Sequence, residues 1–170
     1  MDKQSKQIIS AQYDDLIKKY GLNRRSLFVE GARYNEDHQK LKFQYVLDQL
    51  DENDSLLDVG CGLGHLADFS RRGGWKGDYT GVDISQGMVA ASRQRLKTES
   101  IFQTDILTET YEQEHSVVAC ISTLQEKTTS GNQDEYLQMM IKKMLQISNK
   151  CIVFDVFSSK FIDYEDPRNL

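Results

Sequence analysis

The sequence predicts an α/β fold with a doubly wound, mainly parallel sheet. From residue 55 on, short apolar runs alternate with segments that are long enough to hold helices. This alternation is typical of repeated strand–helix–strand units, in which helices cover both faces of a parallel sheet. The first apolar run, SLLDV, ends in the glycine-rich turn GCGLG at residues 60–64. Such a turn is the usual ending for a strand whose backbone comes close to a ligand.

Length and charge narrow the possible classes of protein. The 170 residues suit one domain, because a chain of this size buries roughly 70% of the surface that it exposes when unfolded. There are 26 acidic and 21 basic residues, which gives a net charge of −5. A chain of this sign repels phosphate backbones, so we do not expect nucleic acid as a partner. Cys61, Cys120 and Cys151 have no C-x-x-C spacing, so we expect reduced thiols and no metal site.

Residues 1–54 are expected to form a helical segment that packs on the sheet or covers its ligand site. Ile9, Tyr13 and Ile17 follow helical spacing, and Gly21 is a good residue to end that helix. Asn35 is suited to cap a second helix, which should contain Phe43, Val46, Leu47 and Leu50. The sequence shows no apolar run of membrane length and no signal peptide, so we expect a cytoplasmic protein without a membrane segment.

Residues 55–157 should form the sheet and its helices. The runs DYTGVD, SIFQT, SVVACI and KCIVFDVF follow SLLDV and are interpreted as further strands. Leu66 and Phe69 mark a helix after the glycine turn, and Ser85 is a suitable cap for the next. A last helix is predicted from the helical spacing of Leu137, Met140, Ile141 and Met144.

The glycine spacing excludes one large ligand class. The dinucleotide fingerprint G-x-G-x-x-G would need a glycine where this chain has His65. A nicotinamide or flavin site is therefore disfavoured. The spacing present is D-x-G-x-G-x-G, formed by Asp58, Gly60, Gly62 and Gly64. Glycines there remove Cβ atoms that would block a ligand, and the acid is placed to bond the loop or a cationic ligand group.

This stretch resembles motif I of the class I S-adenosylmethionine-dependent methyltransferases, and the resemblance extends over residues 55–157. YTGVDIS is similar to the second-strand motif, which implies that Asp83 binds both ribose hydroxyls. FQTDIL is similar to the third-strand motif, which implies that Asp105 accepts from the adenine amino group. The residues themselves leave plainer alternatives open, since Asp83 could only begin a helix and Asp105 could only end a strand.

The resemblance implies a Rossmann-like core that binds S-adenosyl-L-methionine and releases S-adenosyl-L-homocysteine. The implied cofactor-binding residues are Asp58, Gly60, Cys61, Gly62, Gly64, Asp83, Ile84, Met88, Thr104, Asp105, Ile106 and Ile121. The segment CISTLQEKTT would meet the methionine end of the cofactor and the acceptor. Neither the motifs nor the spacing identifies a catalytic base.

The function that we expect is methyl transfer to a small molecule. The motif [DN]-P-P-[FY] of enzymes that methylate bases or glutamine is absent after the fourth strand, where the chain reads ISTLQ. A protein side chain stays open as the acceptor. The alternative function is a methyltransferase-like cofactor-binding protein with a regulatory or scaffolding role and no turnover. The segment FVEGARYNEDHQ, with Arg33 and Tyr34, could close the site or merely connect two helices.

The C-terminal residues 158–170 form a polar tail without an alternating apolar run. The family resemblance implies a seven-stranded sheet whose last two strands form a hairpin, and building one takes ~40 residues at usual element lengths. We therefore expect five parallel strands, no C-terminal hairpin and a truncated chain. The exposed strand would favour self-association. Cofactor binding with poor turnover is the expected behaviour.

Overall fold

The computed structural model describes residues 3–27, 35–98, 100–107, 110–124 and 132–156. The elements, in chain order, are α1 (Lys3–Tyr20), the short 3₁₀ helix η1 (Arg24–Leu27), α2 (Glu36–Leu47), β1 (Ser55–Val59), α3 (His65–Arg72), β2 (Asp78–Asp83), α4 (Gln86–Leu96), β3 (Ile101–Gln103), β4 (His115–Cys120), α5 (Gln133–Gln146) and β5 (Ser148–Phe154). In the part of the chain so described, no helix has the length and apolar character that a membrane span requires.

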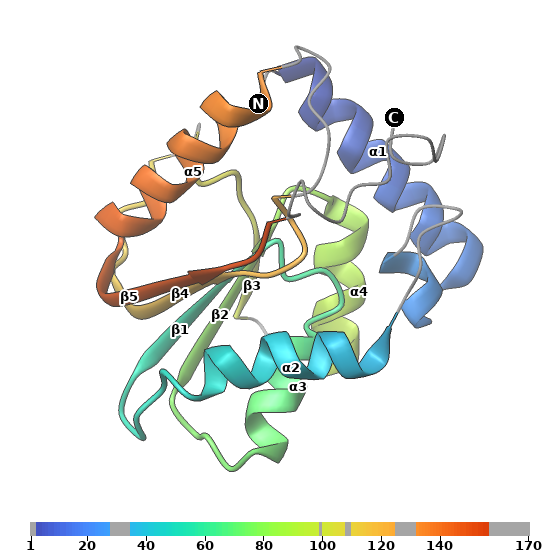
Figure 1. Cartoon of the computed structure of the whole chain (residues 1–170). Coiled ribbons are helices and arrows are strands. Elements are labelled where there is room, and N and C mark those ends of the chain that lie inside the picture. The colour runs from blue at the N-terminus through green and yellow to red at the C-terminus, as the bar shows by residue number, and fades with distance from the viewer. Residues whose placement is uncertain (1–2, 28–34, 99, 108–109, 125–131, 157–170) are drawn as a thin grey trace.

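The five described strands form one parallel sheet in the order β3-β2-β1-β4-β5. Helices α2, α3 and α4 pack on one face and α5 packs on the other (Figure 1). The predicted doubly wound parallel sheet is confirmed. Because the strand order reverses between β1 and β4, the carboxyl ends of these strands diverge there, which is where open α/β sheets bind ligands.

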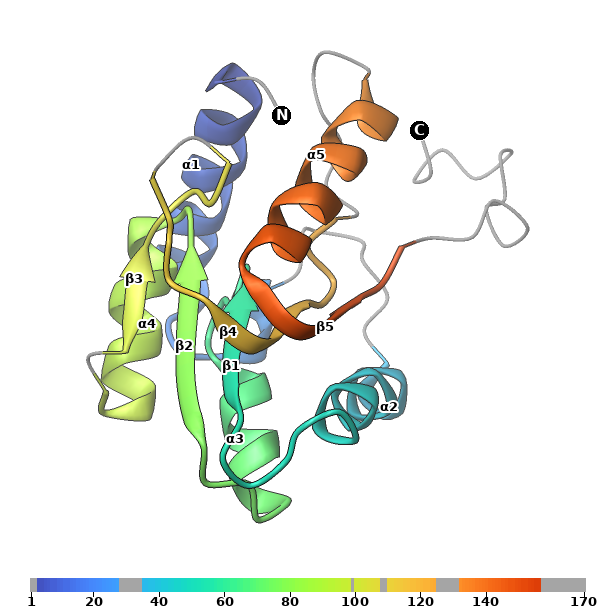
Figure 2. The same ribbon diagram turned by 90° about the vertical axis from the view of Figure 1, so that its left-hand side faces the viewer.

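The core lies on both faces of the sheet, as the apolar runs predict. Leu56 and Val117 are fully buried on the α2–α3 side, whereas Leu57 and Val118 are fully buried on the α5 side. Neighbouring side chains of a strand point to opposite faces, so a continuous apolar run fills both. Helix α1 packs against α4 and η1 near the carboxyl ends of the strands (Figure 2).

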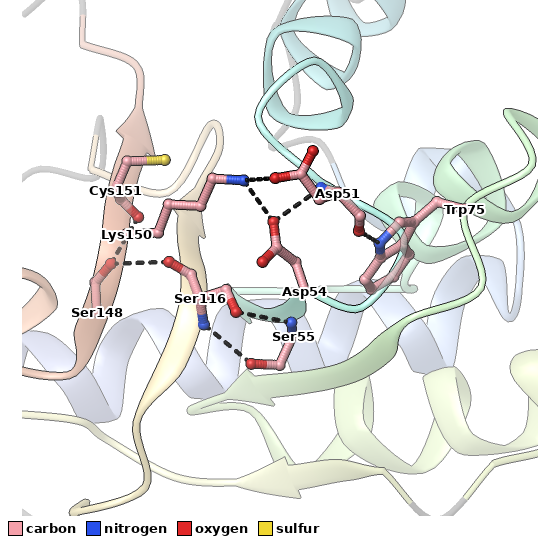
Figure 3. A network of polar contacts seen from close by, with 8 residues as sticks. All are labelled: Asp51, Asp54, Ser55, Trp75, Ser116, Ser148, Lys150 and Cys151. Atoms are coloured by element: carbon pink, nitrogen blue, oxygen red, sulfur yellow. Dashed lines mark hydrogen bonds and ion pairs between the residues drawn. The ribbon is translucent and has the colours of Figure 1, made fainter.

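A polar network ties the strands together at the amino end of the sheet (Figure 3). The ammonium of Lys150 lies 2.7 Å from the Asp51 carboxylate and 2.6 Å from that of Asp54. The backbone N–H of Ser55 donates to Ser116 Oγ at 3.1 Å, and the N–H of Ser116 donates back to Ser55 Oγ at 2.9 Å. These contacts join β1, β4 and β5 at the amino ends of the strands, away from the carboxyl ends where a ligand is expected, so their role is structural.

Local signals placed the helix boundaries well, with one difference. Asn35 caps α2 by accepting from the N–H groups of Asp37 and His38, and Gly21 ends α1 with a φ of +60°. Helix α2 ends at Leu47, so Leu50 reaches the core from the following turn and not from the helix. The segment with Arg33 and Tyr34, and the tail 158–170 with its expected lack of a hairpin, lie outside the described residues.

Candidate functional site

The carboxyl ends of β1 to β4 border a cavity of about 170 Å³, and α1 contributes to its wall. Eleven of the twelve residues predicted from the sequence line this cavity. The exception is Gly64, where an added Cβ would lie 2.5 Å from Leu96 Cδ1 and 3.0 Å from Ser92 Oγ. The structure therefore does not bring Gly64 to the cavity: this glycine lets α3 pack closely against α4.

The two glycines that line the cavity are required by the packing of neighbouring protein segments, apart from any ligand. Gly60 has a φ of +73°, and a Cβ there would lie 2.2 Å from Thr123 Oγ1. Gly62 has a φ of +50°, and a Cβ there would lie 2.8 Å from Leu27 Cδ2. The loop after β4 and the helix η1 therefore pack directly on the glycine turn, a requirement that the motif alone does not reveal.

Asp83 ends β2 and holds the glycine turn in place. Its Oδ2 accepts from the N–H of Gly62 at 2.9 Å, and its Oδ1 accepts from the N–H of Ser85 at 2.9 Å. Burial raises the pKa of Asp83 above its usual value, and these two N–H groups oppose that rise. A carboxylate has about four acceptor sites, so each oxygen can take a further donor from a ligand.

Asp58 is buried at the end of β1, with 4% of its surface exposed. Its carboxyl group accepts from the Tyr79 hydroxyl at 2.7 Å. Burial raises the pKa of Asp58 to about 7, the Tyr79 hydrogen bond opposes the rise, and the charge of Asp83 adds to it. The sequence suggested a bond to the loop or to a ligand cation. Tyr79 was missed because this contact depends on the register between β1 and β2.

The raised pKa of Asp58 predicts a pH-dependent stability. The folded state keeps the proton between the usual pKa of about 4 and the folded pKa of about 7, so this group's stabilisation is complete below pH 4 and is lost as pH rises through 7. Between pH 5 and pH 8 the wild type should therefore lose about 3 kcal/mol more unfolding free energy than Asp58→Asn does. Urea denaturation at both pH values measures this difference.

Tyr79→Phe is the matched control for this prediction. The Tyr79 hydroxyl lowers the pKa of Asp58, so its removal should shift the loss of stability to higher pH. His65 has a lowered pKa, so its contribution to the unfolding free energy changes with pH in the opposite direction to that of Asp58. Taking the difference between the wild type and Asp58→Asn at each pH cancels this contribution. Equal pH slopes for the wild type and Asp58→Asn would contradict the prediction.

Asp105 follows β3 and is contacted by a residue that sequence reasoning did not single out. Its Oδ1 accepts from the N–H of Leu107 at 3.0 Å, and its Oδ2 forms an ion pair with Lys6 of α1. Both Lys6 and Asp105 line the cavity. No local signal marks Lys6, because the pair joins segments 99 residues apart.

A second missed group lies beyond the carboxyl ends of β4 and β5. The Lys42 ammonium lies 2.6 Å from Asp155 Oδ2 and 3.1 Å from Ser122 Oγ, and the N–H of Ser122 donates to the Asp155 carboxylate. Ser122 lines the cavity with a φ of +60°, a conformation that costs energy for a non-glycine residue. Asp155 and Lys42 therefore hold a strained backbone at the edge of the site.

His65 and Cys61 also line the cavity, and both are uncharged at neutral pH. Burial and the nearby guanidinium groups of Arg95 and Arg24 lower the pKa of His65 to about 4. Burial raises the pKa of the Cys61 thiol, which packs against Gly81. Among the described residues no three or more histidine, cysteine or acidic side chains are grouped so that they could hold a metal ion. The groups of this cavity that remain ionisable near neutral pH are therefore the carboxyl groups of Asp58, Asp83 and Asp105 and the ammonium of Lys6.

Comparison with known proteins agrees with this geometry. The family described as the methyltransferase domain matches residues 56–146, which is more than half of the chain. A putative methyltransferase, Rv1506c of Mycobacterium tuberculosis, is 46% identical over 43 residues, which are 25% of this chain and 26% of that protein. A ubiquinone biosynthesis O-methyltransferase of Hydrogenovibrio crunogenus is 31% identical over 80 residues, which are 44% of this chain and 32% of that protein.

The aligned segments thus span about a third or less of these curated relatives. Among solved structures, the geranyl diphosphate C-methyltransferase of Streptomyces coelicolor, in complex with S-adenosyl-L-homocysteine, superposes with a TM-score of 0.57 at 14% identity. The match covers 85% of this chain and 62% of that one, and it shows a shared fold. The family match, the parallel sheet and the glycine turn lead to one conclusion: this chain belongs to the methyltransferase domain family.

Proposed function

We propose that the cavity binds S-adenosyl-L-methionine and that the protein transfers its methyl group to a small molecule. The observation that carries the proposal is that Asp83, Asp105 and the glycine turn face one cavity from the ends of three neighbouring strands. In this arrangement Asp83 accepts from the ribose hydroxyls and Asp105 accepts from the adenine amino group. Charge-assisted hydrogen bonds of this kind contribute about 1.5–3 kcal/mol each.

Apolar side chains flank the proposed adenine position. Ile84, Met88 and Ile106 line the cavity beside Asp83 and Asp105. A purine has two large apolar faces and a polar edge, so it gains from such walls only if acceptors and donors meet the edge. The combination of acids and aliphatic side chains therefore favours a nucleoside over a simple sugar or a phosphate.

The other side of the cavity supports a small apolar acceptor. Phe43, Ile121, Tyr136 and Met140 line it on the side of α2, α5 and the loop after β4. A predominantly apolar wall with few polar groups is typical of small-molecule sites. One similar protein is named for ubiquinone biosynthesis and another for geranyl diphosphate, both small molecules.

Methyl transfer requires this chain mainly to position the acceptor and to exclude water from the site. When bound, the cofactor supplies an activated sulfonium methyl group. The protein's part is to hold an acceptor in line with that group and to keep water out. Ser122 and Thr123 provide hydroxyl groups on the acceptor side, and α1 covers the adenine side. His65 is neutral at pH 7, so it adds no positive charge to the cavity.

Binding of S-adenosyl-L-homocysteine tests the proposal most directly. Calorimetry should show one site with an affinity in the micromolar range and no binding of NAD, because the glycine spacing departs from the dinucleotide fingerprint. Labelled S-adenosyl-L-methionine incubated with small phenols, quinols and amino sugars should then reveal transfer. Absence of S-adenosyl-L-homocysteine binding would overturn the proposal. Binding without transfer to any acceptor would favour the regulatory or scaffolding role.

Two further expectations stay predictions. Strand β5 lies at one end of the sheet and pairs with β4 alone among the described strands, which is the basis for the expected self-association. Its residues Cys151 to Phe154 are half-buried, so a partner strand there would cover apolar surface. The cytoplasmic location expected from the sequence likewise remains a prediction.

A further inference from the structure

The cationic side chain of Lys6, in helix α1, lines the cavity and forms an ion pair with Asp105. The Lys6 ammonium contacts the Asp105 carboxylate, and the two side chains are only 16% and 15% exposed. Both line the cavity together with Ile84, Met88 and Ile106. An ion pair in such surroundings is screened less by water than a surface pair, so its position has consequences for any ligand.

The position of Lys6 is fixed by three hydrogen bonds of two more residues on the same face of the helix. Ser10 Oγ donates to the Ile84 carbonyl at 3.3 Å. Asp14 Oδ1 accepts from Ser85 Oγ at 2.6 Å and from the N–H of Gly87 at 2.8 Å. Lys6, Ser10 and Asp14 are spaced four residues apart, which places them on one side of a helix.

Gly87 shows how closely α1 approaches the site. A Cβ at Gly87 would lie 2.8 Å from Asp14 Oδ1 and 3.3 Å from Asp14 Cα. A larger residue at this position would push α1 away from the start of α4. Helix α1 is therefore built into the wall of the cavity next to the proposed adenine position, and Lys6 is presented from a defined backbone.

We propose that Lys6 and Asp105 together recognise the edge of the adenine ring by hydrogen bonds, an inference that rests on the proposed function. In adenine the amino group is a donor, and each ring nitrogen beside it, N1 or N7, is an acceptor. Asp105 supplies the acceptor for the amino group, and Lys6 supplies the donor for the neighbouring ring nitrogen. An ammonium has three donors and a carboxylate about four acceptor sites, so the ion pair leaves capacity on both partners.

Lys6 is thus a specificity-determining residue for the cofactor. It also offsets the charge of Asp105, which would otherwise be costly to cover with an apolar ring. The opposite reading is that Lys6 occupies Asp105 only in the empty site and must be displaced by adenine. The two hypotheses predict opposite effects of removing the ammonium. If adenine must displace Lys6, its removal strengthens binding; if Lys6 donates to adenine, its removal weakens binding.

Calorimetry with S-adenosyl-L-homocysteine and its 1-deaza and 7-deaza analogues separates these readings. Lys6→Met should weaken S-adenosyl-L-homocysteine about tenfold, and Lys6→Arg should retain most of the affinity. One of the two analogues should bind the wild type about tenfold more weakly than S-adenosyl-L-homocysteine. Lys6→Met should bind that analogue and S-adenosyl-L-homocysteine equally, because the donor for the missing nitrogen is already absent.

Lys18→Met is the matched control, since Lys18 lies on the same helix but pairs with Asp15 in an exposed position. It should bind like the wild type and keep the melting temperature of the wild type, because an exposed ion pair contributes little to stability. Unchanged or tighter binding by Lys6→Met would overturn the inference while leaving the proposed function intact. If every analogue that binds the wild type weakly binds Lys6→Met just as weakly relative to S-adenosyl-L-homocysteine, the inference is overturned as well. Failure of the wild type to bind S-adenosyl-L-homocysteine would overturn both.

Discussion

Replacing Asp83 by alanine is expected to weaken S-adenosyl-L-homocysteine binding by about 3 kcal/mol, which is roughly a hundredfold. The expected loss is large because this carboxylate has two tasks. It is the proposed partner of both ribose hydroxyls, and it already accepts from the N–H groups of Gly62 and Ser85. Without it, the glycine turn loses its link to the start of α4. Calorimetry on the purified variant measures the change.

Asp105→Ala serves as the comparison for Asp83→Ala. Asp105 is proposed to accept a single bond from an amino group that water can partly solvate, so its loss should cost about tenfold in affinity. Asp83→Asn should fall between the wild type and Asp83→Ala, since the amide keeps the shape and one acceptor oxygen. If Asp83→Ala bound as tightly as the wild type while melting at the same temperature, the ribose would be misplaced in this proposal.

Gly60→Ala is expected to lower the unfolding free energy by about 3 kcal/mol, the largest stability effect predicted for this chain. Two causes add. An alanine with a φ of +73° is strained, and its Cβ would overlap Thr123, whose Oγ1, Cγ2 and Cβ lie at 2.2, 2.5 and 2.9 Å from it. The loop after β4 would have to move from the glycine turn. Urea denaturation at constant pH gives the free energy.

Gly21→Ala separates the two causes. Gly21 has a φ of +60° with no heavy atom within 4 Å of an added Cβ, so its replacement should cost only the backbone strain of about 1 kcal/mol. The double variant Gly60→Ala with Thr123→Ala should recover part of the loss, because it removes the two closest atoms. A cost at Gly60 no greater than that at Gly21 would show that the close packing of Thr123 is not rigid.

Patterns within short stretches determined most of the fold. The apolar runs predicted the five described strands, and the caps at Asn35 and Ser85 are where the sequence placed them. The reason is that strand alternation, helix spacing and capping depend on residues within one element. The three acids Asp58, Asp83 and Asp105 could be predicted for the same reason: each lies at or just beyond the carboxyl end of a parallel strand, and these ends meet at one edge of the sheet.

The sequence by itself thus determined the sheet, its glycine turn and the acids at the strand ends. Only the tertiary structure decided which side chains meet those acids: Tyr79 at Asp58, and Lys6 at Asp105. It also decided that Gly64 serves helix packing and that Asp155 supports Ser122. The physical reason is distance along the chain. These contacts depend on strand register and on how α1 and α4 pack, and such packing is set by the whole core and not by any local pattern.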